Sequence, residues 1–321
     1  MIVDLNDGYI GKSEVHDVYQ TDYQLKETIE PPEEIAIMSK RWFLRDSNYS
    51  PNFPTSAAKA AWFLEKSKGP SVDTVIAVTE SVFEDVLTSV GPVRLPGFSQ
   101  DITSDNFNTL FTYVIEAKLS GTDDPKKILK KFVPIFEKNL LKNGDYKKLA
   151  SLVAKDIKER RIMAYSKAPD IEAFFERAGL SGELNVPSEK EDYLQIVHTN
   201  IGGNKSDRYV SENVKHDSFI NYKGEIENEL TIEKKHNWNF NTELNWFETI
   251  KSFGFEEITE PVKEVMGRGK NVTFTRIYVP IGSKLISINS TPVLDYIEPP
   301  VQTKTDSDNG MTYFFVRMEV E

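Results

Sequence analysis

The fold class of the first half of the chain depends on the stretch Val72-Asp73-Thr74-Val75-Ile76-Ala77-Val78-Thr79 and the residues that follow it as far as Val93. Its first part is a short β-branched apolar run, which predicts a strand buried on both faces in a parallel sheet. Thr79 can cap a helix that follows at once, and Gly91-Pro92 would end that helix. One side of this helix carries an apolar stripe, Val82, Phe83, Val86, Leu87 and Val90. A strand followed so closely by a helix indicates an α/β unit.

Further segments extend this α/β pattern upstream and downstream. Residues 13–25 alternate loosely and predict a strand, and an Ala-rich helix follows, capped by Thr55 or Ser56 and ending near Gly69-Pro70. Another short strand, 161–165, leads into a helix from Pro169. Ile171, Phe174 and Phe175 are expected to face inward from that helix.

A helical insertion is predicted between about residues 103 and 160. An apolar stripe runs from Phe107 to Leu119 at helical spacing, and a second helix should begin at Asp123-Asp124-Pro125 and kink at Pro134. A third helix starts near Asp145. We therefore predict an α/β domain over residues 1–190 that carries this insertion.

After about residue 190 the apolar residues recur with period two, which predicts an antiparallel β-rich domain over residues 191–321, with a β-sandwich as one candidate architecture. Asn221-Tyr222-Lys223-Gly224 is a hairpin signal between two of the strands. Residues 246–255 interrupt the pattern as a short helix. The predicted strands cover 193–198, 209–220, 225–234, 272–279, 284–288 and 312–320.

Composition excludes several classes of protein. The 321 residues include 39 Lys and Arg, 50 Asp and Glu and no cysteine, so the net charge is −11. An acidic chain is a poor general nucleic-acid binder, and the lack of cysteine excludes disulfides, thiolate metal sites and a cysteine nucleophile. No apolar run reaches membrane-spanning length and no signal peptide is visible, so the chain is expected to be soluble. Both ends resemble the middle of a strand, and we expect a segment of a longer protein.

The common signatures of enzymes are missing from the sequence. The four histidines lie far apart, and there is no HExxH pair, no phosphate-binding GxxxxGK[ST] loop, no GxGxxG and no GxSxG. Neither a nucleotide nor haem is expected as a cofactor.

The first candidate site is the Pro-punctuated segment from Arg41 to Thr55. Guanidinium groups at Arg41 and Arg45 suit a phosphate or pyrophosphate, and Asp46 and Asn48 are candidate Mg²⁺ ligands. The alternative is structural: Asp46 and Asn48 cap turns, and Arg45 pairs with Asp46 on the surface.

The second candidate site is the glycine-rich stretch Asn200-Ile201-Gly202-Gly203-Asn204-Lys205-Ser206-Asp207. Its glycines could expose backbone N–H groups to an anion, with Lys205 as a point charge that binds substrate. The alternative is a plain connection that leaves a strand.

Charge is uneven along the chain. Residues 126–161 contain 12 Lys and Arg against 4 Asp and Glu, a local charge of +8. Such a run is either the solvated face of amphipathic helices or a docking surface for lipid headgroup phosphates or an anionic polymer.

The motifs resemble those of the bacterial family catalogued as domain of unknown function 4012. They are Asp17-Val18-Tyr19, the segment from Arg45 to Ala57, the 72–78 strand with its Gly91-Pro92-Val93 helix end, and Asp192 to Asp207. The resemblance spans nearly the whole chain. It implies a bacterial, extracytoplasmic envelope protein, tethered through an upstream membrane helix that this chain lacks.

The order of the Arg45-Asp46 loop, helix, strand and helix is also similar to that of the LytR-CpsA-Psr envelope transferases. That resemblance implies a phosphotransferase acting on a polyprenyl-pyrophosphate-linked glycopolymer, in which Arg45 holds pyrophosphate and Asp46 holds Mg²⁺. The alternative is a non-catalytic extracytoplasmic module that binds polysaccharide or a protein partner through the β-rich half. Trp238 and Trp246 are candidate sugar-stacking faces, with burial in the core as the other interpretation.

Overall fold

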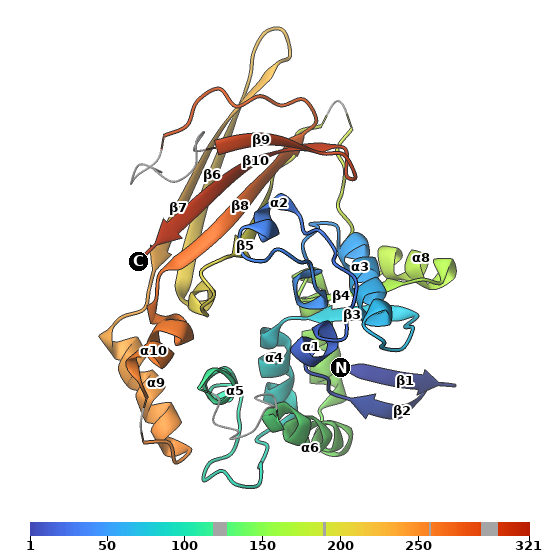
Figure 1. The fold of residues 1–321 in the computed structure, drawn as a ribbon, viewed down its shortest axis with the longest axis vertical. Coiled ribbons are helices and arrows are strands. Elements are labelled where there is room, and N and C mark those ends of the chain that lie inside the picture. Colours follow the sequence, from blue (N-terminus) through green and yellow to red (C-terminus); the bar gives the residue numbers. More distant parts are fainter. Residues whose placement is uncertain (118–126, 189–190, 257, 290–300) are drawn as a thin grey trace. The chain divides into compact units, whose positions relative to one another are not determined.

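The computed structural model describes residues 1–117, 127–188, 191–256, 258–289 and 301–321, and the chain divides into two compact units (Figure 1). The first unit contains Met1–Lys190 with Thr249–Phe255 and Ser307–Gly310. The second contains Glu191–Glu248, Glu256–Asp306 and Met311–Glu321. The first unit is mixed α/β and the second is rich in antiparallel strands, which confirms the predicted fold class.

The first unit combines two small antiparallel sheets with helices. Strand β1 pairs with β2, and β3 pairs with β4. Its elements are β1 (Ile2–Asn6), β2 (Tyr9–Glu14), α1 (Val18–Asp22), α2 (Glu33–Ala36), the 3₁₀ turn η1 (Leu44–Asp46), α3 (Phe53–Lys66), β3 (Thr74–Val78), α4 (Glu80–Val90), α5 (Phe107–Glu116), α6 (Lys127–Asn143), α7 (Tyr146–Lys158), β4 (Ile162–Ser166) and α8 (Pro169–Arg177).

The core of this unit is a cluster of phenylalanine rings from α4, α5 and α6. Phe132 is fully buried and lies 5.0 Å from Phe111, 5.3 Å from Phe136 and 5.5 Å from Phe107, between ring centroids. These spacings suit aromatic pairing. The apolar stripes predicted for α4 and α5 are therefore the faces that meet in the core.

Two predicted strands of the first unit are corrected. Residues 13–25 are not one strand, because β2 ends at Glu14 and Asp17 caps α1 by accepting from the backbone N of Tyr19 at 3.2 Å. Strand β3 is not in a parallel sheet: it pairs antiparallel with β4, and Ile76 is 61% exposed. Helix α3 packs against this two-stranded sheet, which leaves the other side of β3 open.

Backbone hydrogen bonds show which edge of β3 is free. Asp73 O accepts from Lys167 N, and Thr79 N donates to Arg161 O, so the odd-numbered residues of β3 face β4. The backbone groups of Thr74, Ile76 and Val78 therefore point to the opposite edge, where the described part of the chain places no strand.

The inward face predicted for α8 is also wrong. Ile171 and Phe174 are 42% and 55% exposed, and Phe175 is half-buried. The helical period is present, but no described element covers that face.

Two further predictions, Leu119 and a helix start at Asp123 to Pro125, lie outside the described residues. Helix α6 continues through Pro134.

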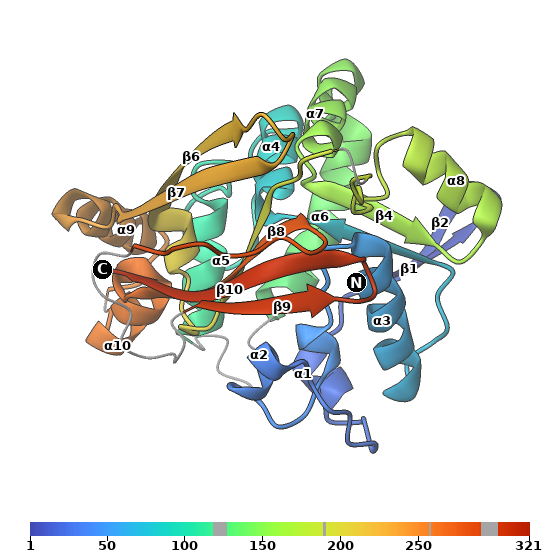
Figure 2. The same cartoon turned by 90° about the horizontal axis from the view of Figure 1, so that it is seen from above.

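The second unit is built on a four-stranded antiparallel sheet with the order β5-β8-β10-β9. A long hairpin, β6-β7, forms a separate layer against this sheet (Figure 2). The elements are β5 (Gln195–Asn200), the 3₁₀ turn η2 (Ser206–Tyr209), β6 (Val210–Ile220), β7 (Ile226–His236), α9 (Phe240–Ser252, whose last turn from Thr249 belongs to the first unit), α10 (Glu260–Lys263), the π-helical turn η3 (Glu264–Arg268), β8 (Asn271–Pro280), β9 (Val301–Asp306) and β10 (Met311–Val320).

The predicted hairpin at Asn221 to Gly224 is confirmed, since Asn221 N donates to Glu225 O and Gly224 has φ +80°. The strand predicted at 284–288 is wrong, because that segment is irregular and β9 takes the place at the sheet edge beside β10. The predicted short helix at 246–255 is the later part of α9, which starts earlier because Asn239 caps it. No helix in the described ranges is both long and apolar enough to cross a membrane.

The phenylalanine cluster gives a stability prediction. We expect Phe132→Ala to lower the free energy of unfolding by about 3–5 kcal/mol, because it leaves a cavity among the other rings. Phe174→Ala removes an exposed ring of the same unit and should change the free energy of unfolding by no more than about 0.5 kcal/mol. Urea denaturation followed by circular dichroism measures both; equal losses would contradict the assigned core.

Candidate functional site

The predicted Arg41 to Asn48 site is organised around a buried carboxylate on α1. Asp22 is 3% exposed and accepts from Leu44 N at 2.9 Å and from Arg45 Nη1 at 3.0 Å. The Arg45 guanidinium also lies 4.3 Å from the centre of the Phe43 ring. Arg45 therefore holds the η1 turn against α1.

Arg41 is engaged in the same way by backbone groups. Its Nη2 donates to Leu25 O at 3.0 Å and to Glu27 O at 2.8 Å, and its guanidinium lies 5.0 Å from the centre of the Phe43 ring. Arg41 and Arg45 thus contact the same ring. The structure brings these two predicted site residues together, and both also have structural partners.

Two carboxylates share the Arg45 charge. Asp46 Oδ2 lies 3.5 Å from Arg45 Nε, a contact too long for a normal hydrogen bond. Burial raises the pKa of both Asp22 and Asp46, and the Arg45 cation opposes that rise. Arg45 therefore pairs more closely with Asp22 than with Asp46, the partner expected in the structural interpretation.

The donor set does not form a preassembled metal site. Asp46 faces the Arg45 cation, and Asn48 is exposed on the loop that follows η1. Nowhere in the described chain do three or more His, Asp or Glu side chains gather so that they could hold a metal ion. Mg²⁺ binding by Asp46 and Asn48 stays a prediction.

The glycine-rich stretch of the second unit is held by its own polar side chains. Asn200 Oδ1 accepts from Gly202 N at 2.9 Å, and Asn204 Oδ1 accepts from Ser206 N at 3.1 Å. Ser206 Oγ and Asp207 Oδ1 accept from Asn271 at the start of β8, at 3.1 and 2.7 Å. The polar residues of this motif therefore anchor a loop to the sheet.

Few backbone N–H groups of this loop remain for an anion. Gly202 N, Lys205 N and Ser206 N all donate inside the protein, Lys205 N to Val265 O at 2.8 Å. The Lys205 side chain is exposed. This geometry favours the connecting-loop interpretation, and substrate binding by Lys205 stays a prediction.

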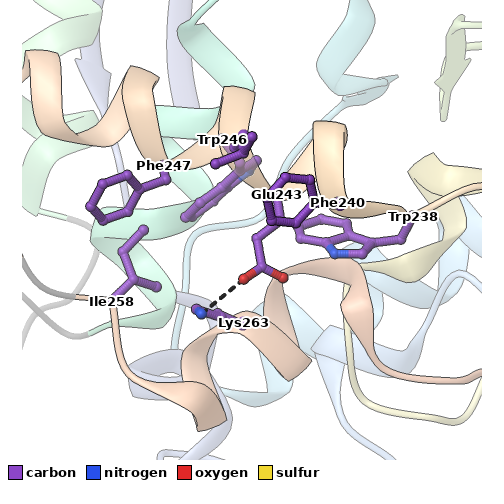
Figure 3. A pocket seen from close by; sticks show the side chains of 8 residues that line it. Trp238, Phe240, Glu243, Trp246, Phe247, Ile258 and Lys263 are labelled. Carbon is purple, nitrogen blue, oxygen red and sulfur yellow. Dashed lines mark hydrogen bonds and ion pairs between the residues drawn. The ribbon is translucent and has the colours of Figure 1, made fainter.

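An aromatic hollow in the second unit is lined by Trp238, by side chains of α9 and by Ile258 and Lys263 (Figure 3). Its volume is about 130 Å³. Helix α9 contributes five of the lining side chains, and Asn239 caps this helix and so sets the direction of its first turns. The lining residues are Trp238, Phe240, Glu243, Leu244, Trp246, Phe247, Ile258 and Lys263.

The aromatic side chains of this hollow differ in exposure. Phe240 is 74% exposed, Trp238 is half-buried, and Trp246 is only 6% exposed. Trp238 packs edge-on against Tyr209 at 4.6 Å between ring centroids. Of the two tryptophans predicted as sugar-stacking faces, Trp246 belongs to the core and Trp238 keeps an accessible edge.

The charged groups at the hollow are paired with one another. Lys263 Nζ lies 2.8 Å from both Glu243 Oε1 and Glu260 Oε1, and Arg268 reaches Glu260 Oε2 at 2.7 Å. The Lys263 hydrogen bond lowers the pKa of Glu243, and the Trp238 indole and Arg268 contribute further. Trp238 Nε1 is buried and still makes no hydrogen bond of normal geometry.

A second polar cluster, between hairpin β6-β7 and the sheet, was not found by sequence reasoning. His198 on β5 contacts Glu212 of β6 through Nε2 at 2.8 Å and Thr275 of β8 through Nδ1 at 2.8 Å. Lys234 of β7 lies 3.3 Å from His198 Nδ1 and donates to Thr273 at 3.1 Å. Four strands supply these residues. In the sequence, only the position of each residue in the period-two pattern of its strand could have indicated that they face the same space between the hairpin and the sheet.

Burial controls the protonation of this interlayer cluster. Burial lowers the pKa of His198, the Lys234 cation lowers it further, and the hydrogen bond to Glu212 opposes this. Burial also lowers the pKa of Lys234, and Glu212 and Asp207 oppose the shift. The fully buried Thr275 cannot meet a substrate, so the cluster fits a structural role.

Comparison with known families gives one match. Residues 1–114 match the model of a family described as "Protein of unknown function (DUF4012)". This supports the predicted resemblance over 114 of the 321 residues, and the motif at 192–207 lies outside the match. Neither the comparison with curated proteins nor that with solved structures gives a significant match. The similarity to LytR-CpsA-Psr transferases stays a prediction.

The His198 cluster predicts a pH dependence of stability. Since the folded pKa of His198 lies below its ordinary value of 6.5, the unfolded chain takes up this proton first on acidification, and stability is lost as the pH falls below about 6.5. Between pH 7.5 and 5.5 we expect the melting temperature of His198→Gln to fall less than that of the wild type. His216→Gln, at an exposed position of the same hairpin, should behave like the wild type. A wild-type pH profile in His198→Gln would contradict the assignment.

Proposed function

We propose that the protein is a polysaccharide-binding module of the bacterial cell envelope and that the aromatic hollow holds a neutral sugar. The observation that carries this proposal is the combination, in one hollow, of the exposed Phe240 ring, the half-buried Trp238 and Phe247 rings and the Glu243 carboxylate. Rings contact the C–H faces of a pyranose, and a sugar hydroxyl can donate to Glu243.

The charge state of the hollow favours a neutral glycan over a polyanion. Lys263 and Arg268 are both matched by the carboxylates of Glu243 and Glu260, so neither cation is free for a phosphate. A protein partner that inserts an apolar side chain would use the same rings but would gain nothing from the Glu243 carboxylate. The envelope location is part of the proposal and rests on the family resemblance.

Calorimetry with neutral oligomers of N-acetylglucosamine, glucose and mannose tests the proposal. We expect Phe240→Ala to weaken binding of the preferred oligomer about five- to tenfold, because a stacking face is lost. Glu243→Gln keeps the size of the side chain but removes the charged acceptor, and should weaken binding as well. Phe219→Ala, at a 58% exposed ring of the hairpin, is the matched control. Absence of binding to all three oligomers would reject the proposal, and an apolar peptide whose binding tolerates Glu243→Gln would favour a protein partner.

A second proposal is the LytR-CpsA-Psr-like phosphotransferase. Its specific support is that Arg41 and Arg45 contact one ring, Phe43, beside Asp46, so that two cations lie in one small region. In this proposal Arg45 and Asp46 are the catalytic residues, and Arg41 and Asn48 bind the polyprenyl-linked substrate. Lys205, in the second unit, is proposed separately as a substrate-binding residue. The partners of the two guanidinium groups, Asp22 and backbone carbonyls, weigh against it.

Binding of polyprenyl pyrophosphate in the presence of Mg²⁺ tests this second proposal. Arg45→Ala should weaken binding at least tenfold if Arg45 holds the pyrophosphate. Arg94→Ala removes a surface guanidinium that pairs with Asp101 and serves as the control. Because Arg45 also pairs with buried Asp22, circular dichroism must show that the variant is folded. Equal affinities would remove Arg45 from the site.

A further inference from the structure

The outer face of α6 is a basic stripe, with two pairs of lysines, one on either side of the exposed Pro134. Its exposed positions follow helical spacing, with lysines at Lys127, Lys131, Lys138 and Lys142. The inner face carries Ile128, Phe132 and Phe136, all buried in the phenylalanine cluster. The helix therefore presents its cations on one side because its apolar side is fixed in the core.

These four cations have no assigned partner. In the part of the chain that the structure describes, none of the four lysines forms an ion pair, whereas Lys155 of α7 pairs with Asp85 at 3.3 Å and Lys148 donates to Thr88 O. The nearby acidic Asp145 caps α7 by accepting from Lys147 N and Lys148 N. Lys148 and Lys155 of α7 thus contact residues of α4, whereas the four lysines of the outer stripe make no such contact in the described part of the chain.

Two exposed apolar side chains lie at the end of this stripe, where α6 turns into α7. Leu141 is 68% exposed and Tyr146 is 61% exposed. Tyr146 OH donates to Leu141 O at 2.9 Å, so the two residues are adjacent across the turn. Gly144 permits the tight turn, because a Cβ there would lie 2.6 Å from Leu140 O.

We propose that this basic corner, defined as the Lys127, Lys131, Lys138 and Lys142 stripe with Leu141 and Tyr146 at its tip, docks on the surface of an anionic lipid bilayer. Lysines at this spacing reach headgroup phosphates along a flat surface, and Leu141 and Tyr146 enter the interface between headgroups and acyl chains. This interaction is independent of the sugar hollow, which belongs to the other unit.

The apolar tip favours a lipid surface over a soluble polyanion. A solvated helix face or a polyanion site gains nothing from two large apolar side chains held next to each other in water. At a bilayer interface those side chains are removed from water, and a tyrosine is well suited to that depth because its ring is apolar and its hydroxyl is polar.

Flotation with vesicles tests the proposal with the whole chain. We expect binding to vesicles of phosphatidylglycerol and phosphatidylcholine, little binding to phosphatidylcholine alone, and a decline as salt rises from about 50 to 500 mM. Lys138→Ala/Lys142→Ala should weaken binding at least tenfold, since each lysine near an anionic surface contributes roughly fivefold. Lys26→Ala/Lys40→Ala removes the same charge from exposed positions elsewhere and should not weaken it.

Leu141→Ala separates a bilayer from a soluble polyanion. It should weaken vesicle binding several-fold, and Ile37→Ala, at a residue of similar exposure, should not. No binding to anionic vesicles would overturn the proposal. It would also be overturned if Leu141→Ala bound vesicles like the wild type, or if soluble polyphosphate bound as tightly as vesicles.

Discussion

The second unit depends on the burial of polar side chains along β8, the strand at the centre of its hydrogen bonding. Strand β8 pairs with β5 on one side and β10 on the other, and Asn271, Thr273, Thr275 and Arg276 are all at most 2% exposed. Buried polar groups are costly unless they are hydrogen-bonded. Each of these side chains therefore requires a hydrogen-bond partner: Arg276 donates to Tyr278 of the same strand, and the other three use partners from other segments.

Those partners determine where the surrounding segments lie. Asn271 holds the loop of the 200–207 motif, Thr273 receives Lys234 from the hairpin, and Thr275 meets His198. Because these contacts attach β6-β7 and η2 to the sheet, they also position Tyr209, against which Trp238 packs. The shape of the aromatic hollow is in this sense a consequence of polar burial some distance away. Gly267, with φ +139°, completes the arrangement, because a side chain there would overlap the Tyr209 ring.

Local signals predicted the helices well and the long-range contacts poorly. The apolar stripe of α4 and the Asp145 cap of α7 depend on neighbours in sequence, so reading the chain locally was enough to find them. The prediction that the apolar face of α8 points inward was wrong. The helical period shows only that such a face exists, whereas the exposure of Phe174 depends on whether another element covers it. The parallel sheet was predicted from apolar content, which does not specify the direction of the partner strand.

The candidate sites show the same division. Arg45 and Asp46 were singled out by residue type, but the carboxylate that binds Arg45 most closely is Asp22, 23 positions earlier. Trp238 and Trp246 were named as sugar-binding faces, and only the packing of α9 distinguishes the buried ring from the accessible one. Residue chemistry therefore indicated which side chains to consider, and the tertiary contacts decided what each can do.

The open edge of β3 has a consequence for association between molecules. A strand with unpaired backbone groups and exposed Ile76 and Val78 is a template for strand addition by another chain. In concentrated solutions this edge is one site where intermolecular β-aggregation of the first unit can nucleate.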